Sequence, residues 1–316
     1  MELYSIFMVL GFSFTVYSVI ANDSMQTLGT FIASNKKVKW QYLWLFITSI
    51  LLFTIWYSWF AYSGDISYGR LDRIPFQEIQ WYHVAAPISL VILTRYGIPV
   101  STSLLVLSTF ASGVVFSKIL TNSLLGYSIA FIVAMVLWYI ISKFFENYFK
   151  AELSKKSEQR WRYFQWFSTG FLWWSWLTHD MANISVFLPR NIELYQMFLV
   201  SIAFSLALLY IFAQRGGKIQ ELILSKTNIE YIKTATLIDL VYAFILLYFK
   251  EYNNIPMSTT WVFVGLLAGR EFGLYATNKN IVFKDLFPIV GKDLIKVLFG
   301  LAISIITVLL VQGIGA

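Results

Sequence analysis

Two acidic residues stand within apolar sequence, each close to an amide side chain. Asn22 immediately precedes Asp23, and Asn183 follows Asp180 by three positions. A carboxylate at membrane depth is costly unless it is paired, protonated or bound to a cation. Ligands that are all oxygens suit a hard cation rather than a soft metal. We therefore expect a cation to be bound by Asn22, Asp23, Asp180 and Asn183.

A second motif has the pattern Pro-x-Ser-Thr-(Ser/Thr) and occurs from Pro99 and again from Pro256. Proline suits the first turn of a helix, where its missing amide would have no acceptor. The amides that follow also lack intrahelical acceptors, and they lie at the positive end of the helix dipole. Together with the three hydroxyls, these amides would form an oxyanion-binding site that needs no positively charged side chain. The expected anion ligands are Ser101, Thr102, Ser103, Ser258, Thr259 and Thr260.

The two motifs are repeated at a constant interval. Pro99 lies 76 residues after Asp23, Pro256 lies 76 residues after Asp180, and the copies are 157 residues apart in a chain of 316. Alone, each carboxylate could be a helix cap, and each Ser-Thr run could simply pack against a neighbouring helix. Duplication at constant spacing favours a functional role, and it is expected of a transporter built from two related halves.

Other kinds of chemistry find little support in the sequence. The chain has no cysteine, which excludes disulfides, thiolate metal sites and a cysteine nucleophile. It has no Walker A, HExxH or GxGD pattern, so ATP-driven transport and the familiar intramembrane proteases lose support. His179 is one of only two histidines. Beside Asp180, it could hydrogen-bond a carbonyl group or take part in proton coupling.

The composition indicates that lipid surrounds these motifs. Hydrophobic residues make up 58% of the chain and charged residues only 13%, about half the charged share of a soluble domain. The mean hydropathy is +0.65. The net charge of +7 comes from basic residues in short loops, where they set topology rather than bind nucleic acid. We therefore predict an all-α polytopic membrane protein.

The apolar segments form two sets of five, one in each half of the chain. They are 4–34, 42–62, 81–93, 98–116 and 124–145, followed by 163–189, 194–213, 235–249, 255–268 and 294–312. Segment 4–34 is too long for one straight crossing of a core of about 30 Å. Several other segments are short or interrupted by proline, which predicts broken or re-entrant helices around a site at the membrane midplane.

Loop charges indicate that the two halves have opposite orientations. Loop 35–41 carries three lysines, whereas in its counterpart near 190–196 one arginine is balanced by one glutamate. Loop 63–80 has a net charge of −1, and its counterpart 214–233 has +2. Positive charge thus changes side between the copies. We predict a first inverted repeat over 1–145, a basic cytoplasmic connector over 146–162 and a second inverted repeat over 163–316, with both termini external.

These motifs resemble those of the inorganic phosphate transporter (PiT) family of sodium- or proton-coupled symporters. The family patterns read roughly Gly-Ala-Asn-Asp-x-x-Asn-Ala and Pro-x-Ser-Thr-Thr-His, and the resemblance covers about residues 20–116 and 177–271. Gln26 replaces the later Asn in the first copy, and His179 replaces the first Asn in the second. The final His is Leu104 in one copy and Trp261 in the other. The chain thus resembles a divergent member.

The resemblance implies an inverted-repeat fold with a central oxyanion site beside sodium sites, formed by the cation and anion ligands named above. We expect no cofactor and no catalytic residue, with sodium as the coupling ion or a proton as its alternative. Some members of the family are dimers, so a homodimer is left open.

We interpret the chain as a cation-coupled symporter that imports a small inorganic oxyanion across a bacterial-type inner membrane, with phosphate as the first candidate. It is not expected to be an enzyme. The alternatives left open are a sulfate or other oxyanion permease and a non-transporting membrane receptor or scaffold. An intramembrane hydrolase with an aspartate dyad is a further alternative, which only the two aspartates support.

Overall fold

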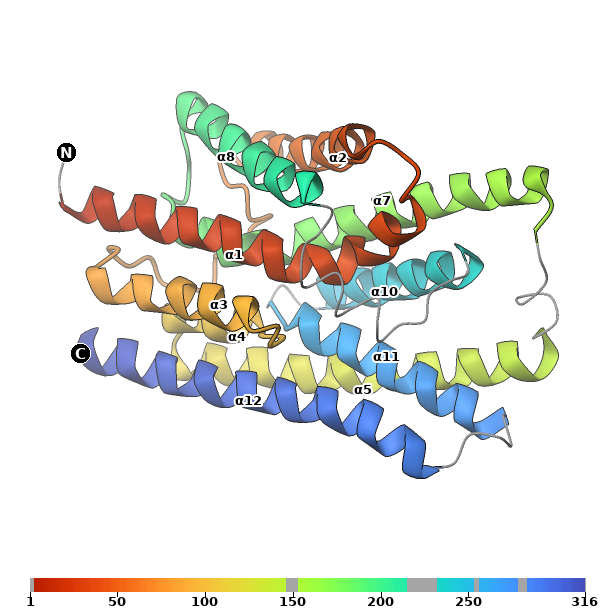
Figure 1. The fold of residues 1–316 in the computed structure, drawn as a ribbon. Helices are drawn as coiled ribbons and strands as arrows, with labels where there is room; N and C mark the ends of the chain where they lie inside the picture. The colour runs from red at the N-terminus through yellow and green to blue at the C-terminus, as the bar shows by residue number, and fades with distance from the viewer. Residues whose placement is uncertain (1–2, 146–152, 215–231, 253–255, 278–282, 316) are drawn as a thin grey trace.

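The computed structural model describes residues 3–145, 153–214, 232–252, 256–277 and 283–315, and all regular secondary structure in them is helical (Figure 1). The elements of the first half are α1 (Leu3–Ser34), α2 (Trp40–Ala61), η1 (Trp81–Val84), α3 (Ala85–Arg95), α4 (Thr102–Leu105), η2 (Leu107–Thr109) and α5 (Gly113–Phe144). Those of the second half are α7 (Lys155–Ser185), α8 (Leu194–Ala213), α10 (Ile232–Tyr252), α11 (Thr259–Thr277) and α12 (Phe283–Gly315).

The protein is a multi-pass membrane protein. Among the described helices, six are long and apolar enough to cross a membrane, namely α1, α2, α5, α8, α10 and α12. The prediction of an all-α polytopic membrane protein is thereby confirmed. α7 is not among the six because polar residues occur along its whole length, from the charged first turns to Thr178, His179, Asp180 and Asn183. Its second half is instead enclosed by protein, and every residue from Thr178 to Ser185 is buried.

Helices of the two halves run in opposite directions through the bundle (Figure 1). α1 starts at the end of the molecule where both termini lie, whereas α7 starts at the other end and runs back toward it. α5 and α12 are likewise opposed. The end of α5 and the start of α7 both lie at the end of the bundle opposite the termini (Figure 1).

Hydrogen bonds join the two halves of the chain at both ends of the bundle. At one end, the Ile192 amide donates to the Gly64 carbonyl oxygen at 3.0 Å, which joins the loop after α2 to the loop after α7. At the other end, Arg162 Nη1 donates to the Ser34 carbonyl oxygen and to Asn35 Oδ1, both at 3.1 Å. The start of α7 is thereby fixed to the end of α1.

Several helix boundaries differ from the apolar segments of the sequence. Segment 4–34 forms one continuous 32-residue helix rather than two crossings. The second half of this helix is surrounded by protein. Segment 98–116 does not form a helix along its length, because α3 ends at Arg95 and α5 begins only at Gly113. Between them lie an extended stretch, the single turn α4 and the short helix η2.

The expected connector lies only partly within the described residues. Positions 146–152 lie outside them, as do most of the basic loop 214–233 and the residues 253–255 before the second Pro-Ser-Thr motif. The described part, from 153 onward, already belongs largely to α7, which begins at Lys155 after an N-cap at Ser154.

α11 packs against α5 through a row of three glycines. Gly265, Gly269 and Gly273 are spaced by four residues, so they lie on one face of α11. A Cβ on Gly273 would lie 2.5 Å from the Met135 carbonyl oxygen, and Cβ atoms on the other two would collide with the backbone one and two turns earlier in α5. Small residues that let two backbones approach are a recurrent basis of helix association in membranes.

We predict that Gly269→Ala destabilises the protein, because its new methyl group meets the carbonyl oxygen of Phe131 rather than a movable side chain. Overpacking of this kind costs about 1–3 kcal/mol. The measurement is thermal unfolding of the purified protein in detergent. Gly313→Ala is the matched control, since an added Cβ there meets nothing within 4 Å. Equal melting temperatures for the two variants would contradict the close packing.

Candidate functional site

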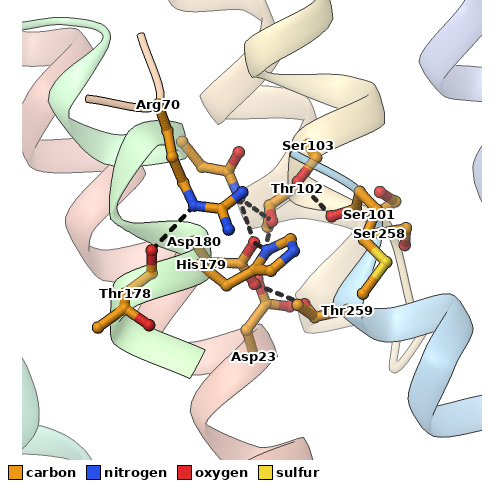
Figure 2. Close-up of polar contacts among 12 residues, drawn as sticks. Asp23, Arg70, Ser101, Thr102, Ser103, Thr178, His179, Asp180, Ser258 and Thr259 are labelled. Atoms are coloured by element: carbon orange, nitrogen blue, oxygen red, sulfur yellow. Dashed lines mark hydrogen bonds and ion pairs between the residues drawn. The ribbon is translucent and has the colours of Figure 1, made fainter. Parts of the chain in front are cut away.

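The two aspartates lie at the centre of the bundle. Asp23 is in α1 and Asp180 is in α7, and neither side chain has any exposed surface. Two carboxylates buried among apolar helices require strong hydrogen bonds or bound cations to offset their lost hydration. The surrounding polar side chains supply such hydrogen bonds (Figure 2).

Each aspartate accepts a hydrogen bond from a threonine of a Pro-Ser-Thr motif. Thr102 Oγ1 donates to Asp23 Oδ2 at 2.9 Å, and Thr259 Oγ1 donates to Asp180 Oδ2 at 2.5 Å. Donor and acceptor are 79 residues apart in both pairs, and each member of one pair lies 157 residues from its counterpart in the other. The sequence repeat is therefore also a repeat of one hydrogen bond.

The other oxygen of each carboxylate is bonded by amide groups that follow the same repeat. Gln26 Nε2 lies 3.4 Å from Asp23 Oδ1, and Asn183 Nδ2 lies 3.1 Å from Asp180 Oδ1. Asn22 Nδ2 also donates to Asp23 Oδ1 at 2.6 Å, while His179 Nδ1, at the equivalent place, lies 3.4 Å from Asp180 Oδ1.

The same amides connect each acidic motif to the Pro-Ser-Thr segment of the other motif pair. Asn183 Nδ2 donates to Thr102 Oγ1 at 2.9 Å, and Gln26 Nε2 donates to Thr260 Oγ1 at 3.2 Å. All four partners are buried. Within the described residues, the amide oxygens Gln26 Oε1 and Asn183 Oδ1 are also buried but accept no hydrogen bond. Two repeat-related acceptor oxygens are thus available beside the two carboxylates.

The serines of the two motifs are helix N-caps. Ser101 Oγ accepts from the Leu104 amide and Ser258 Oγ from the Trp261 amide, both at 3.1 Å. The expectation that proline occupies the first helical turn is wrong in both copies, because α4 begins at Thr102 and α11 at Thr259. Serine is a preferred N-cap. In both copies the helix therefore begins three residues after the proline.

The remaining two hydroxyls of the motifs bond to backbone across the site. Ser103 Oγ donates to the Met257 carbonyl oxygen at 3.0 Å, and Thr260 Oγ1 to the Val100 carbonyl oxygen at 3.2 Å. The two Pro-Ser-Thr segments are therefore held against each other. The structure brings together all six expected anion ligands and all four expected cation ligands, with His179 beside them.

The two copies differ in the helix that follows the motif. α4 has four residues, whereas α11 has 19. A helix dipole builds up over several aligned turns, so only the second copy presents a full helix N-terminus. The expectation that each Pro-Ser-Thr motif lies at the positive end of a helix dipole is therefore met by a long helix only in the second copy.

Sequence reasoning missed three residues of this region. Gln26 could have been found, because it lies 157 residues before Asn183. Tyr242, whose hydroxyl donates to the Thr259 carbonyl oxygen at 2.9 Å, belongs to no motif. Arg70 was counted only as a loop charge, although its side chain is buried and its Nε donates to the Thr178 carbonyl oxygen at 3.0 Å.

A third buried carboxylate lies outside the repeated motifs. Asp239 in α10 accepts hydrogen bonds from Thr30 Oγ1 at 3.0 Å and Thr169 Oγ1 at 2.6 Å. It therefore links α10 to both α1 and α7, the helices that carry Asp23 and Asp180.

One solved structure, titled "The sodium-dependent phosphate transporter", is similar to this chain along almost its whole length. The TM-score is 0.65 and the sequence identity is 16%, with 98% of this chain and 96% of the other covered. The chain has the fold of a sodium-dependent phosphate transporter. The resemblance to the PiT family is thereby confirmed at the level of the fold, and the similar protein is a transporter rather than an enzyme. No protein-family model and no curated protein matches the sequence.

We predict that Ser258→Ala destabilises the start of α11 by about 1 kcal/mol, the usual cost of losing an N-cap side chain. Thermal unfolding in detergent measures the effect. Ser304→Ala is the matched control, because among the described residues this buried serine donates only to the Gly300 carbonyl oxygen of its own helix. A Ser258→Ala variant as stable as the control would show that the cap does not stabilise α11.

Proposed function

We propose that the protein is a cation-coupled symporter of a small inorganic oxyanion, with phosphate as the first candidate substrate. The observation that carries the proposal is the repeated arrangement at the centre of the bundle, where two buried aspartates each accept from a threonine of a Pro-Ser-Thr motif. The fold shared with a sodium-dependent phosphate transporter supports the same conclusion. In this proposal the chain is a member of the PiT family.

The proposed cation sites are centred on the two aspartates. Asp23 with Asn22 and Gln26 would form one, and Asp180 with Asn183 the other. The unpartnered oxygens Gln26 Oε1 and Asn183 Oδ1 support this assignment, because a buried acceptor without a donor is suited to a cation. Sodium is the coupling ion proposed first. His179, beside Asp180, keeps proton coupling as the alternative.

The proposed anion site lies between the two Pro-Ser-Thr segments. Its donors would be Ser101, Thr102 and Ser103 from one segment and Ser258, Thr259 and Thr260 from the other, together with the backbone amides of Thr259 and Thr260 in the first turn of α11. In the present arrangement Thr102 and Thr259 donate to the aspartates. We infer that cations binding to the carboxylates release these hydroxyls for the anion.

Coupling follows from electrostatics. Two ionised aspartates repel a divalent anion by about 3 kcal/mol per pair of unit charges, at ~6 Å and an effective dielectric constant of ~20. Cations must therefore bind together with the substrate. Since the site residues are at most 7% exposed, ions would reach them only after a conformational change that opens one side at a time.

We further propose that the halves 1–145 and 163–316 are inverted repeats related by an axis in the membrane plane, joined by a cytoplasmic connector over 146–162. The opposite directions of α1 and α7, and of α5 and α12, support this arrangement (Figure 1). Both termini would be external, in a bacterial-type inner membrane. A homodimer, a sulfate or other oxyanion permease and a non-transporting receptor or scaffold remain the alternatives.

We predict that Asp23→Asn and Asp180→Asn each abolish sodium-driven uptake, because the neutral amide removes the charge that holds the cation. The measurement is uptake of labelled phosphate and sulfate into proteoliposomes, with and without a sodium or a proton gradient. Asp72→Asn, at an exposed loop position, is the control. Wild-type uptake in both site variants would reduce the two aspartates to structural residues. No uptake of either anion by the native protein would favour the receptor or scaffold.

The inverted topology can be tested with single cysteines, because the chain has none of its own. We predict that Lys37→Cys and Ser154→Cys react with a membrane-impermeant maleimide only from the cytoplasmic side. Asp72→Cys and Asn191→Cys should react only from outside. Labelling in intact cells and in inverted vesicles distinguishes the two sides. Ser154 and Asp72 on the same side would contradict the proposed topology.

A further inference from the structure

Arg70 is a buried cation with most of its hydrogen-bonding capacity unused. It lies in the loop between α2 and α3 and is 1% exposed. Its Nε donates to the Thr178 carbonyl oxygen at 3.0 Å. Within the part of the chain that the structure describes, Nη1 and Nη2 are buried and have no partner. Leaving buried charged donors unsatisfied is unfavourable, so the folded state retains them at a cost.

The guanidinium group points into the site. Thr178, which holds it, directly precedes His179 and Asp180 in α7, and Figure 2 shows the group directed toward these residues and toward Thr102. No ion pair with a carboxylate is formed by Arg70 among the described residues. A guanidinium group is not deprotonated in proteins at neutral pH, so the side chain carries a positive charge.

The loop that carries Arg70 is built to hold it in place. Asp65 accepts hydrogen bonds from the Ser67 amide at 2.6 Å and the Gly69 amide at 2.8 Å. Tyr68 has a positive φ of 60°, which is strained for a residue with a bulky side chain, and its hydroxyl donates to the Thr54 carbonyl oxygen at 2.8 Å. Strain maintained by surrounding contacts is a mark of functional positioning.

We propose that Arg70 binds the transported anion, with its two unpartnered nitrogens donating to two oxygens of a doubly charged tetrahedral oxyanion. A guanidinium group presents parallel donors that match such oxygens, and the resulting bonds are charge-assisted. The inference rests on the proposed function. It adds a fixed positive charge to a site for which the sequence predicted only hydroxyls, amides and cations.

This assignment makes the anion site asymmetric. The residue 157 positions after Arg70 is Thr227, so the second half has no arginine at the equivalent place, although Thr227 itself lies outside the described residues. The Arg70 loop lies at the end of the bundle that holds both termini, which the proposed topology makes external. Arg70 would therefore contact the anion from the side on which it enters.

The test compares Arg70→Gln, Arg70→Lys and the control Arg73→Gln, an exposed arginine three residues further along the same loop. In proteoliposomes at saturating sodium, we expect Arg70→Gln to raise the KM for phosphate and sulfate at least about tenfold, the loss typical of hydrogen bonds to a charged group. Arg70→Lys should recover part of the loss. Arg73→Gln should match the native protein, and the sodium concentration for half-maximal uptake should change little in all three.

A second measurement separates binding from transport and from folding. The shift in melting temperature caused by inorganic phosphate or sulfate, in the presence of sodium, is recorded for the purified variants in detergent. We expect the shift to be lost in Arg70→Gln while the melting temperature without anion stays near the native value. A native anion-induced shift in Arg70→Gln overturns the inference, as does a large destabilisation that the anion does not influence.

These outcomes also distinguish the inference from the proposed function. If the native protein binds the anions through Arg70 but transports neither, the inference stands and the symporter proposal fails. If the native protein transports an anion and Arg70→Gln has the native KM, the symporter proposal stands and Arg70 serves only the structure. If neither anion binds to the native protein, both are overturned.

Discussion

The structure depends on the cost of keeping two carboxylates inside an apolar helix bundle. Asp23 and Asp180 are fully buried, and each of their four oxygens accepts at least one hydrogen bond from a threonine or an amide side chain. Those donors come from α1, α4, α7 and α11, so satisfying the carboxylates fixes how the four elements meet. An arrangement that lost these donors would leave charge in a medium that cannot solvate it.

The repeat supplies these donors twice, but the two halves have become different around them. Hydrogen bonds at the same spacing join Thr102 to Asp23 and Thr259 to Asp180. The helix after the first motif is one turn long, whereas α11 continues for 19 residues. The second half therefore contributes a full helix dipole, and the first half contributes the loop that carries Arg70. The two halves supply positive potential by different means.

The sequence predicted the helical class, the membrane location and the meeting of both motifs. These predictions depend on long apolar segments and on residues that are energetically costly within them. Buried carboxylates and repeated prolines are rare in apolar segments, so their spacing is informative. Gln26 was recoverable from the repeat alone. Arg70 was not, because a loop arginine is usually exposed and only the folded chain shows that this one is buried. The break near Pro99 was predicted, but the N-cap positions depended on which hydroxyl bonds to which amide.

The glycine row on α11 has a mechanical consequence. Gly265, Gly269 and Gly273 bring α11 into backbone contact with α5, yet these helices come from different halves of the chain. Over these successive turns the two backbones meet directly, without long side chains between them, so we expect the two helices to move together. Such a pair resists relative sliding more than helices that meet through long side chains. The most closely packed unit of this protein is therefore made of helices from both halves, and it includes α11, which begins within the second Pro-Ser-Thr motif.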